Sequence, residues 1–256
     1  MAVYTTEITS DQIPSDNPIH QRLLQAYYLA IPYINGDLLE LGCGEGRGVE
    51  LIAPKAASYA AIDKIQAVID QLQENYPQHD FRQGHFPPLP YDNESFDSIV
   101  SFQVIEHVKK DELFLEEIHR LLRPGGVALL TTPNIKMTLT RNPWHIREYT
   151  ADQLEAMARK YFENVDMKGV AGNEKVMSYY EENKASVARI TRFDFLNLQY
   201  RLPAALLRIP YDILNRVNRN RLNDSNAGLV GEIQANDYVL KDKDDSNLDL
   251  FLILKK

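Results

Sequence analysis

The chain has 256 residues, of which 44% are hydrophobic and 25% are charged, and its formal net charge at pH 7 is −8. This composition is typical of a globular protein and excludes a disordered or collagen-like chain. The acidic balance argues against a general nucleic-acid-binding protein, because phosphate binding needs a basic face. Cys43 is the single cysteine, which excludes an internal disulfide and any multi-cysteine zinc site.

Two features of the sequence bear on its compartment. No apolar run approaches the roughly 18 residues that a membrane-spanning helix needs. Residues 1–10 lack the basic and apolar regions of a signal peptide. We therefore expect a cytoplasmic protein.

Helix-like and strand-like segments alternate along most of the chain. Short apolar runs predict strands at 37–41, 59–63, 96–102, 127–132, 165–170 and 248–254. Amphipathic stretches predict helices at 18–34, 48–57, 65–76, 110–122 and 151–161. Alternation at this spacing indicates βαβ units, which predict an α/β fold with a mostly parallel sheet.

The pattern divides the chain into three predicted parts. Residues 1–36 form an N-terminal helical lead-in, and residues 37–170 with 236–256 form a cofactor-binding core. Residues 171–235 form a helical, basic insertion or lid before the last strand. Within it, the segment 183–222 carries eight Lys or Arg and two Asp, a balance of +6 against −14 elsewhere. Such a segment is a solvated face, a lid that recruits an anionic substrate, or a patch that contacts anionic lipid.

A glycine-rich turn follows the first predicted strand. Gly42, Gly44 and Gly46 have the spacing G-x-G-x-G, where glycines allow positive φ and let backbone amides approach a ligand. A dinucleotide fold prefers G-x-G-x-x-G. Glu40 suits a cationic amino-acid group better than a pyrophosphate. Asp63, at the end of the second strand, is either a ribose-binding acid or a helix cap.

With these residues in place, the chain resembles the class I S-adenosylmethionine-dependent methyltransferases, in their small-molecule branch. The resemblance covers about residues 37–170. Residues 38–46 resemble the first motif of the family and Asp63 its ribose-binding acid. Residues 89–100, Glu106-His107-Val108, 121–127 and 131–134 resemble later motifs in the same order.

The resemblance implies a Rossmann-like, doubly wound, mostly parallel sheet of seven strands with an antiparallel last strand. The helical insertion before that strand has no counterpart in the family core. The resemblance also implies S-adenosyl-L-methionine as cofactor and S-adenosyl-L-homocysteine as product. Gly84-His85 departs from the family's frequent Gly-Asp, so adenine recognition is expected from His85 or from the Phe86 backbone, or from no side chain. The expected cofactor-binding residues are Glu40, Gly42, Cys43, Gly44, Gly46, Asp63, Lys64, Gly84, His85, Phe86 and Gln103.

Residues near the carboxyl edge of the sheet are candidates for the acceptor site. His107 follows the fourth strand, and His145 lies in a segment beyond the fifth, so both are candidate catalytic bases. Trp144, His145 and Tyr149 are candidate substrate residues, because similar His-x-x-Glu-Tyr loops line the substrate site in the resembling family. No spacing of His, Asp and Glu offers a convincing three-ligand set, so no metal is expected.

Three functions remain open on the sequence. The first is methyl transfer in line from the cofactor to a small-molecule acceptor, which is anionic, sugar-like or lipid-like. The second is an NAD(P)-dependent oxidoreductase, which the glycine spacing disfavours. The third is a non-catalytic sensor or scaffold that binds adenosylmethionine.

Overall fold

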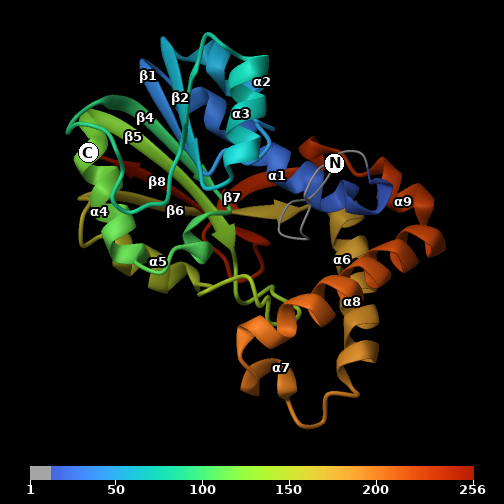
Figure 1. Ribbon diagram of the computed structural model, residues 1–256. Coiled ribbons are helices and arrows are strands. Elements are labelled where there is room, and N and C mark those ends of the chain that lie inside the picture. Colours follow the sequence, from blue (N-terminus) through green and yellow to red (C-terminus); the bar gives the residue numbers. More distant parts are fainter. Residues whose placement is uncertain (1–12) are drawn as a thin grey trace.

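An eight-stranded mixed sheet forms the centre of the computed structural model, which describes residues 13–256 (Figure 1). The first twelve residues, among them the stretch tested for a signal peptide, lie outside the described residues. The strands are β1 (Asp37–Leu41), β2 (Ser58–Asp63), β3 (Asp80–Gln83), β4 (Phe96–Phe102), β5 (Leu122–Pro133), β6 (Asn164–Gly172), β7 (Tyr238–Asp242) and β8 (Asp249–Lys255). Their spatial order is β3-β2-β1-β4-β5-β8-β6-β7.

The strand directions confirm the doubly wound sheet with an antiparallel last strand. β1 to β5 pair in parallel, and β8 lies antiparallel between β5 and β6. The sheet has eight strands instead of the expected seven, because β7 adds to its edge, antiparallel to β6. Only Tyr238 of β7 is buried, so this strand leaves little apolar alternation in the sequence.

Helices cover both faces of the sheet. The α-helices are α1 (Asn17–Ala30), α2 (Val49–Ile52), α3 (Gln66–Asn75), α4 (Asp111–Leu121), α5 (Ala151–Ala158), α6 (Glu174–Thr191), α7 (Leu198–Arg201), α8 (Ala204–Ser225) and α9 (Ala227–Glu232). α1, α2 and α3 share one buried core, and α4 and α5 share the other. Successive residues of β1 contribute to both cores, since Leu38 faces the first core and Leu39 faces the second. Within residues 13–256 no helix is long and apolar enough to cross a bilayer.

Helices α6 to α9 occupy the segment before the last two strands and form a lobe whose base shares a core with α1 (Figure 1). A buried ion cluster ties its base to the start of the described chain: Asp16 accepts from Arg216 at 2.8 Å and from Arg219 at 3.0 Å. Asn17 also donates to the backbone of Val230 at 2.7 Å. By contrast, α7 and the first half of α8 protrude away from the sheet (Figure 1).

Candidate active site

The glycine-rich turn opens onto a cavity of about 670 Å³ at the carboxyl edge of the sheet. Ligands of open α/β sheets bind at this edge. α1 contributes Leu23, Leu24 and Tyr28 to the wall, which the sequence did not predict. Ten of the expected cofactor residues line the cavity: Gly42, Cys43, Gly44, Gly46, Asp63, Lys64, Gly84, His85, Phe86 and Gln103.

Gly44 and Gly46 are each suited to glycine for a different physical reason. Gly44 has φ +51°, and no atom lies within 4 Å of the position that a Cβ would take. Gly46 has φ +80°, and a Cβ there would lie 2.4 Å from Leu72 Cδ2. Gly46 is therefore required for packing on α3, whereas Gly44 leaves open space where a ligand can approach the backbone.

Asp63 closes the turn from the end of β2. Its Oδ2 accepts from the Gly44 amide and its Oδ1 from the Ile65 amide, both at 3.0 Å. Asp63 thus fixes the turn before α3 but does not cap it, because Ile65 is the N-cap residue and α3 has no side-chain cap. An ionised carboxylate offers about four acceptor sites, so these two bonds leave acceptor capacity for a ligand.

Glu40 is the one expected cofactor residue that does not line the cavity. It is 1% exposed, and it accepts from the Tyr27 hydroxyl at 2.7 Å and from the Tyr59 hydroxyl. The pKa of Glu40 is raised because the carboxyl group is buried. The expectation that Glu40 contacts the cofactor directly is therefore corrected: residues alternate in direction along β1, so Glu40 points toward α1 and supports the turn from beneath.

Cys43, His85 and Phe86 line the cavity in different surroundings. Burial raises the pKa of the Cys43 thiol well above its ordinary value, so Cys43 is a neutral packing residue. His85 is exposed, whereas the Phe86 ring stacks on Phe114 with 5.4 Å between centroids. The exposed imidazole and the fixed ring thus offer different surfaces to a ligand.

A second cavity of about 290 Å³ adjoins the first. Leu23, Gln103 and His107 line both. Gln103 has φ +58°, and its backbone N–H donates to the Thr131 carbonyl at 2.9 Å. The chain therefore turns sharply where β4 ends. Unusual backbone of this kind persists where the surrounding structure holds it, often at functional sites.

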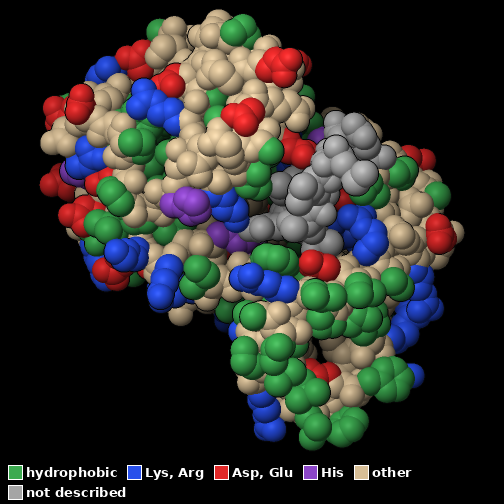
Figure 2. Space-filling view, in the orientation of Figure 1, with side chains coloured by type: hydrophobic (Ala, Val, Ile, Leu, Met, Phe, Trp, Pro, Cys, Tyr) green, Lys and Arg blue, Asp and Glu red, His purple; other side chains and the backbone are tan. Residues whose placement is uncertain are grey.

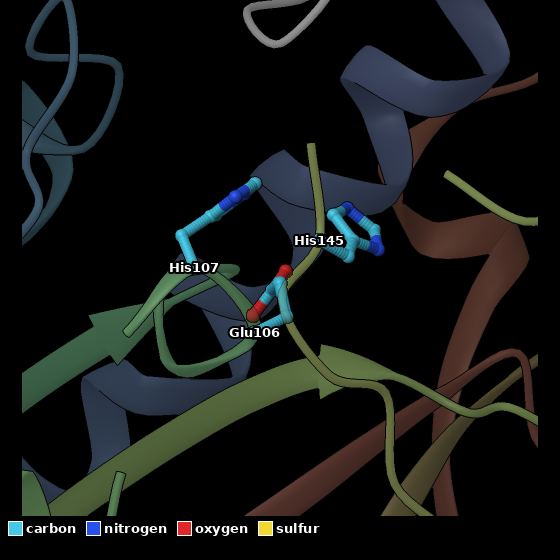
Figure 3. A group of neighbouring side chains, drawn as sticks. All are labelled: Glu106, His107 and His145. Carbon is cyan, nitrogen blue, oxygen red and sulfur yellow. The ribbon is translucent and has the colours of Figure 1, made fainter. Parts of the chain in front are cut away.

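Glu106, His107 and His145 come together beside the second cavity (Figure 3). Glu106 and His107 follow β4, whereas His145 lies in the loop after β5. One potential ligand atom from each residue lies within 4.8 Å of the others. Spacing along the sequence gives no sign of this cluster, because two segments far apart in the sequence supply the three side chains.

The hydrogen bonds of the two histidines define their tautomers. His107 Nδ1 lies 3.0 Å from the Trp144 carbonyl, so that nitrogen carries the proton. Asn142 Oδ1 accepts from the Trp144 amide, which leaves its Nδ2 group to donate to His145 Nε2 at 2.8 Å. His145 Nδ1 then donates to Glu148 at 2.6 Å. A metal ion at His145 would have to break one of these two bonds, so the arrangement favours acid–base chemistry.

Glu106, which the sequence did not select as a site residue, has the more unusual environment. It is 1% exposed; Oε2 accepts from Thr132 at 2.9 Å, and Oε1 has no hydrogen-bond partner within residues 13–256. Burial raises the pKa of Glu106 to about 7, although His145 and the bond from Thr132 lower it. A carboxyl group with this pKa can exchange a proton near neutrality. Its only signal in the sequence is its place in the Glu106-His107 motif.

Trp144 and Tyr149 line neither of these two cavities, which corrects their expected place in the substrate wall. The Trp144 indole donates to Asp212 at 3.0 Å, and Arg208 lies 4.3 Å from its ring centroid. Tyr149 is 2% exposed and donates to Asp111 at 2.8 Å. Trp144 therefore attaches the loop to α8, while Tyr149 attaches it to the core. Of the three expected substrate residues, only His145 lines the second cavity.

Comparison with known proteins agrees with this geometry. Residues 39–130 match the family model described as a methyltransferase domain. A probable S-adenosylmethionine-dependent methyltransferase of Mycolicibacterium smegmatis is 41% identical over 141 residues, which are 52% of this chain and 54% of that protein. Residues 39–130 thus form a methyltransferase domain, and the fold is that of the class I S-adenosylmethionine-dependent methyltransferases.

Two further methyltransferases show how far the similarity extends. The phthiotriol/phenolphthiotriol dimycocerosates methyltransferase of Mycobacterium leprae is 26% identical over 167 residues, 63% of this chain and 61% of that protein. A solved S-adenosylmethionine-dependent methyltransferase of Thermotoga maritima shares the fold, with a TM-score of 0.59, 15% identity, and coverage of 95% of this chain and 91% of that one. The chain spans about half the length of the first relative, so its acceptor stays open.

The methyltransferase cofactor of this family is S-adenosyl-L-methionine, and the first cavity fits it. Gly44 supplies open space at an exposed backbone, and Asp63 supplies carboxylate oxygens for hydroxyl groups. The match to the methyltransferase domain argues against the alternative of an NAD(P)-dependent oxidoreductase. S-adenosyl-L-homocysteine is the corresponding product.

Proposed function

We propose that this methyltransferase methylates a hydroxyl group of a small molecule that occupies the second cavity. The observation that carries the proposal is the Glu106 carboxyl group, buried beside this cavity with Oε1 lacking a hydrogen-bond partner among residues 13–256. His107 lines both cavities and so lies between the cofactor and the acceptor. Methyl transfer is an in-line displacement, and adjoining sites supply the alignment that it needs.

In the proposal, the first cavity holds the cofactor through the turn and the end of β2. Bound there, S-adenosyl-L-methionine supplies an electrophilic methyl group. The backbone at Gly44 and the carboxylate of Asp63 position it, and Gln103 forms part of the wall toward the acceptor.

Glu106 is the proposed general base. Its Oε1 accepts the proton of the acceptor hydroxyl, while Thr132 holds Oε2 in place. A pKa of about 7 suits a base that works near neutral pH. The hydrogen bonds of His145 to Glu148 and Asn142 make that ring a positioning group beside Glu106.

The lining of the second cavity supports a polar, hydroxylated acceptor. Side-chain amides and phenols can donate hydrogen bonds to hydroxyl oxygens as well as accept from them. The M. leprae relative is named for phthiotriol and phenolphthiotriol dimycocerosates, which also supports a small-molecule acceptor. The amide and phenol residues of the lining are Gln103, Asn142, Asn183, Asn215, Asn218, Tyr179, Tyr180, Tyr211 and Tyr238.

The test uses S-adenosyl-L-methionine with an isotopically labelled methyl group. The protein is incubated with it and with a cell extract divided into small-molecule, protein and nucleic-acid fractions. We expect label in the small-molecule fraction, and on an oxygen when the product is analysed by mass spectrometry. The Glu106→Gln variant should bind S-adenosyl-L-homocysteine with unchanged affinity by calorimetry but transfer far less label.

Two outcomes contradict the proposal. Label in protein or nucleic acid would place the acceptor in another class. Binding of S-adenosyl-L-homocysteine without transfer to any fraction would favour the sensor or scaffold.

A further inference from the structure

Helix α8 (Ala204–Ser225) exposes the side that a surface helix normally buries. Leu206, Ile209, Ile213 and Val217 are 65%, 72%, 58% and 57% exposed. Their spacing of three and four residues places them in one stripe along the helix. A surface helix of a globular protein normally turns such a stripe toward the core.

The opposite side of α8 is polar and faces the protein. Tyr211, Asn215, Asn218 and Arg219 line the second cavity. Asn218 accepts from Ser186 of α6 at 2.6 Å, and Arg219 pairs with Asp16 at 3.0 Å. These contacts fix the rotation of the helix, so the apolar stripe stays in solvent.

The stripe continues into the tip of the lobe. Figure 2 shows hydrophobic side chains gathered over the lobe where Figure 1 places α7 and α8, with Lys and Arg beside them. Contiguous exposed apolar surface of this kind marks an interaction site. We call it the apolar face, and its members, each at least 43% exposed, are Phe193, Phe195, Leu196, Leu198, Tyr200, Leu206, Ile209, Ile213, Leu214 and Val217.

The charge around the apolar face is positive. The two acids between residues 189 and 221 have their oxygens engaged: Asp194 accepts from two amides of α7, and Asp212 accepts from Trp144. The segment 183–222 has a formal charge of +6, whereas the rest of the chain has a formal charge of −14. The exposed cations of this segment are Lys184, Arg189, Arg192, Arg201, Arg208 and Arg221.

We propose that the apolar face docks on a membrane surface that contains anionic lipid. Aromatic and aliphatic side chains would enter the interface while the arginines contact the headgroups. A second copy of this chain is a poorer occupant, because a symmetric contact would bring two basic surfaces together. The inference does not depend on the proposed acceptor, although α8 forms both the docking surface and a wall of the second cavity.

The test measures co-sedimentation of the full chain with lipid vesicles. We expect binding to mixed phosphatidylcholine–phosphatidylglycerol vesicles, weaker binding to phosphatidylcholine alone, and a decrease with added salt. Ile209→Ser with Ile213→Ser should lower the partition coefficient by about tenfold or more, because two apolar side chains no longer enter the interface. Ile135→Ser with Val239→Ser is the matched control: these side chains are 44% and 38% exposed outside the lobe, and their loss should not change binding.

Folding and cofactor binding are monitored separately in each variant. Unchanged melting temperature and unchanged calorimetric affinity for S-adenosyl-L-homocysteine would show that only the surface has changed. Three results would overturn the proposal: no binding of the native chain to mixed vesicles, equal loss in both double variants, or a dimer in lipid-free sedimentation that the Ile209/Ile213 variant dissociates.

Discussion

Replacement of Glu106 by Gln tests both the electrostatics of the site and the proposed role of this residue. The amide has the same size as the carboxyl group, and its oxygen can still accept from Thr132, which lies 2.9 Å from Oε2. It cannot ionise. The substitution therefore removes the titration of a side chain that is 1% exposed while keeping its packing.

The magnitude follows from the pKa of Glu106, which burial raises from 4.5 to about 7. A raised pKa means that the folded state favours the protonated carboxyl group. This stabilisation is complete below about pH 4.5, declines as the pH rises, and is lost above about pH 7. The difference between the two pKa values corresponds to about 3 kcal/mol in the free energy of unfolding. The free energy of unfolding of Glu106→Gln, measured relative to that of the native chain, should thus rise by about 3 kcal/mol from acid to neutral pH.

Urea unfolding of both proteins over this pH range measures the difference, and other titrating groups cancel between them. Glu117→Gln is the control, because Arg120 holds the pKa of Glu117 below its usual value. The stability that Glu117 contributes is present above its ordinary pKa and lost as the pH falls, so this variant should show the opposite sign.

The same pair of proteins is then compared in methyl transfer. For the native chain we expect the rate to rise with pH through about 7, and for Glu106→Gln we expect a flat profile and a rate lower by about 10²–10⁴-fold. A stability difference that does not vary with pH would refute the raised pKa. A rising limb that survives in the variant would refute Glu106 as the base.

Four further substitutions, one of them a control, separate the parts of the site. Gly44→Val and Gly125→Val both place a branched side chain at positive φ in open space; both should lose about 1–2 kcal/mol of stability, but only Gly44→Val should abolish binding of S-adenosyl-L-homocysteine in calorimetry. Asp63→Ala should weaken that binding by about 1.5–3 kcal/mol, as expected for loss of a charged acceptor, and unchanged affinity in a folded variant would leave Asp63 only its bonds to the Gly44 and Ile65 amides. His145→Ala should lower kcat with little change in cofactor affinity, because His145 lines only the second cavity; an equal loss of S-adenosyl-L-homocysteine affinity would contradict this division.

The sequence by itself determined the βαβ order, the glycine-rich turn and the edge of the sheet where the cofactor cavity lies. These features follow from short-range properties. Apolar periodicity specifies strands and helices, and Gly44 and Gly46 permit a backbone that other residues rarely adopt. Parallel strands joined by right-handed crossovers then bring the turns to one edge. The apolar pattern missed both edge strands, β3 and β7, because a single buried residue in each leaves almost no periodic signal.

Only the tertiary structure decided what individual side chains face. Glu40 turns toward Tyr27 and Tyr59, and Trp144 toward Asp212, because each finds its partner on another segment. The pKa of Glu106 depends on burial by surrounding elements, which its motif does not encode. The direction of the stripe on α8 is likewise fixed by polar contacts with α6 and with Asp16. Periodicity shows that a helix has two faces, but the contacts made by distant residues determine which one is buried.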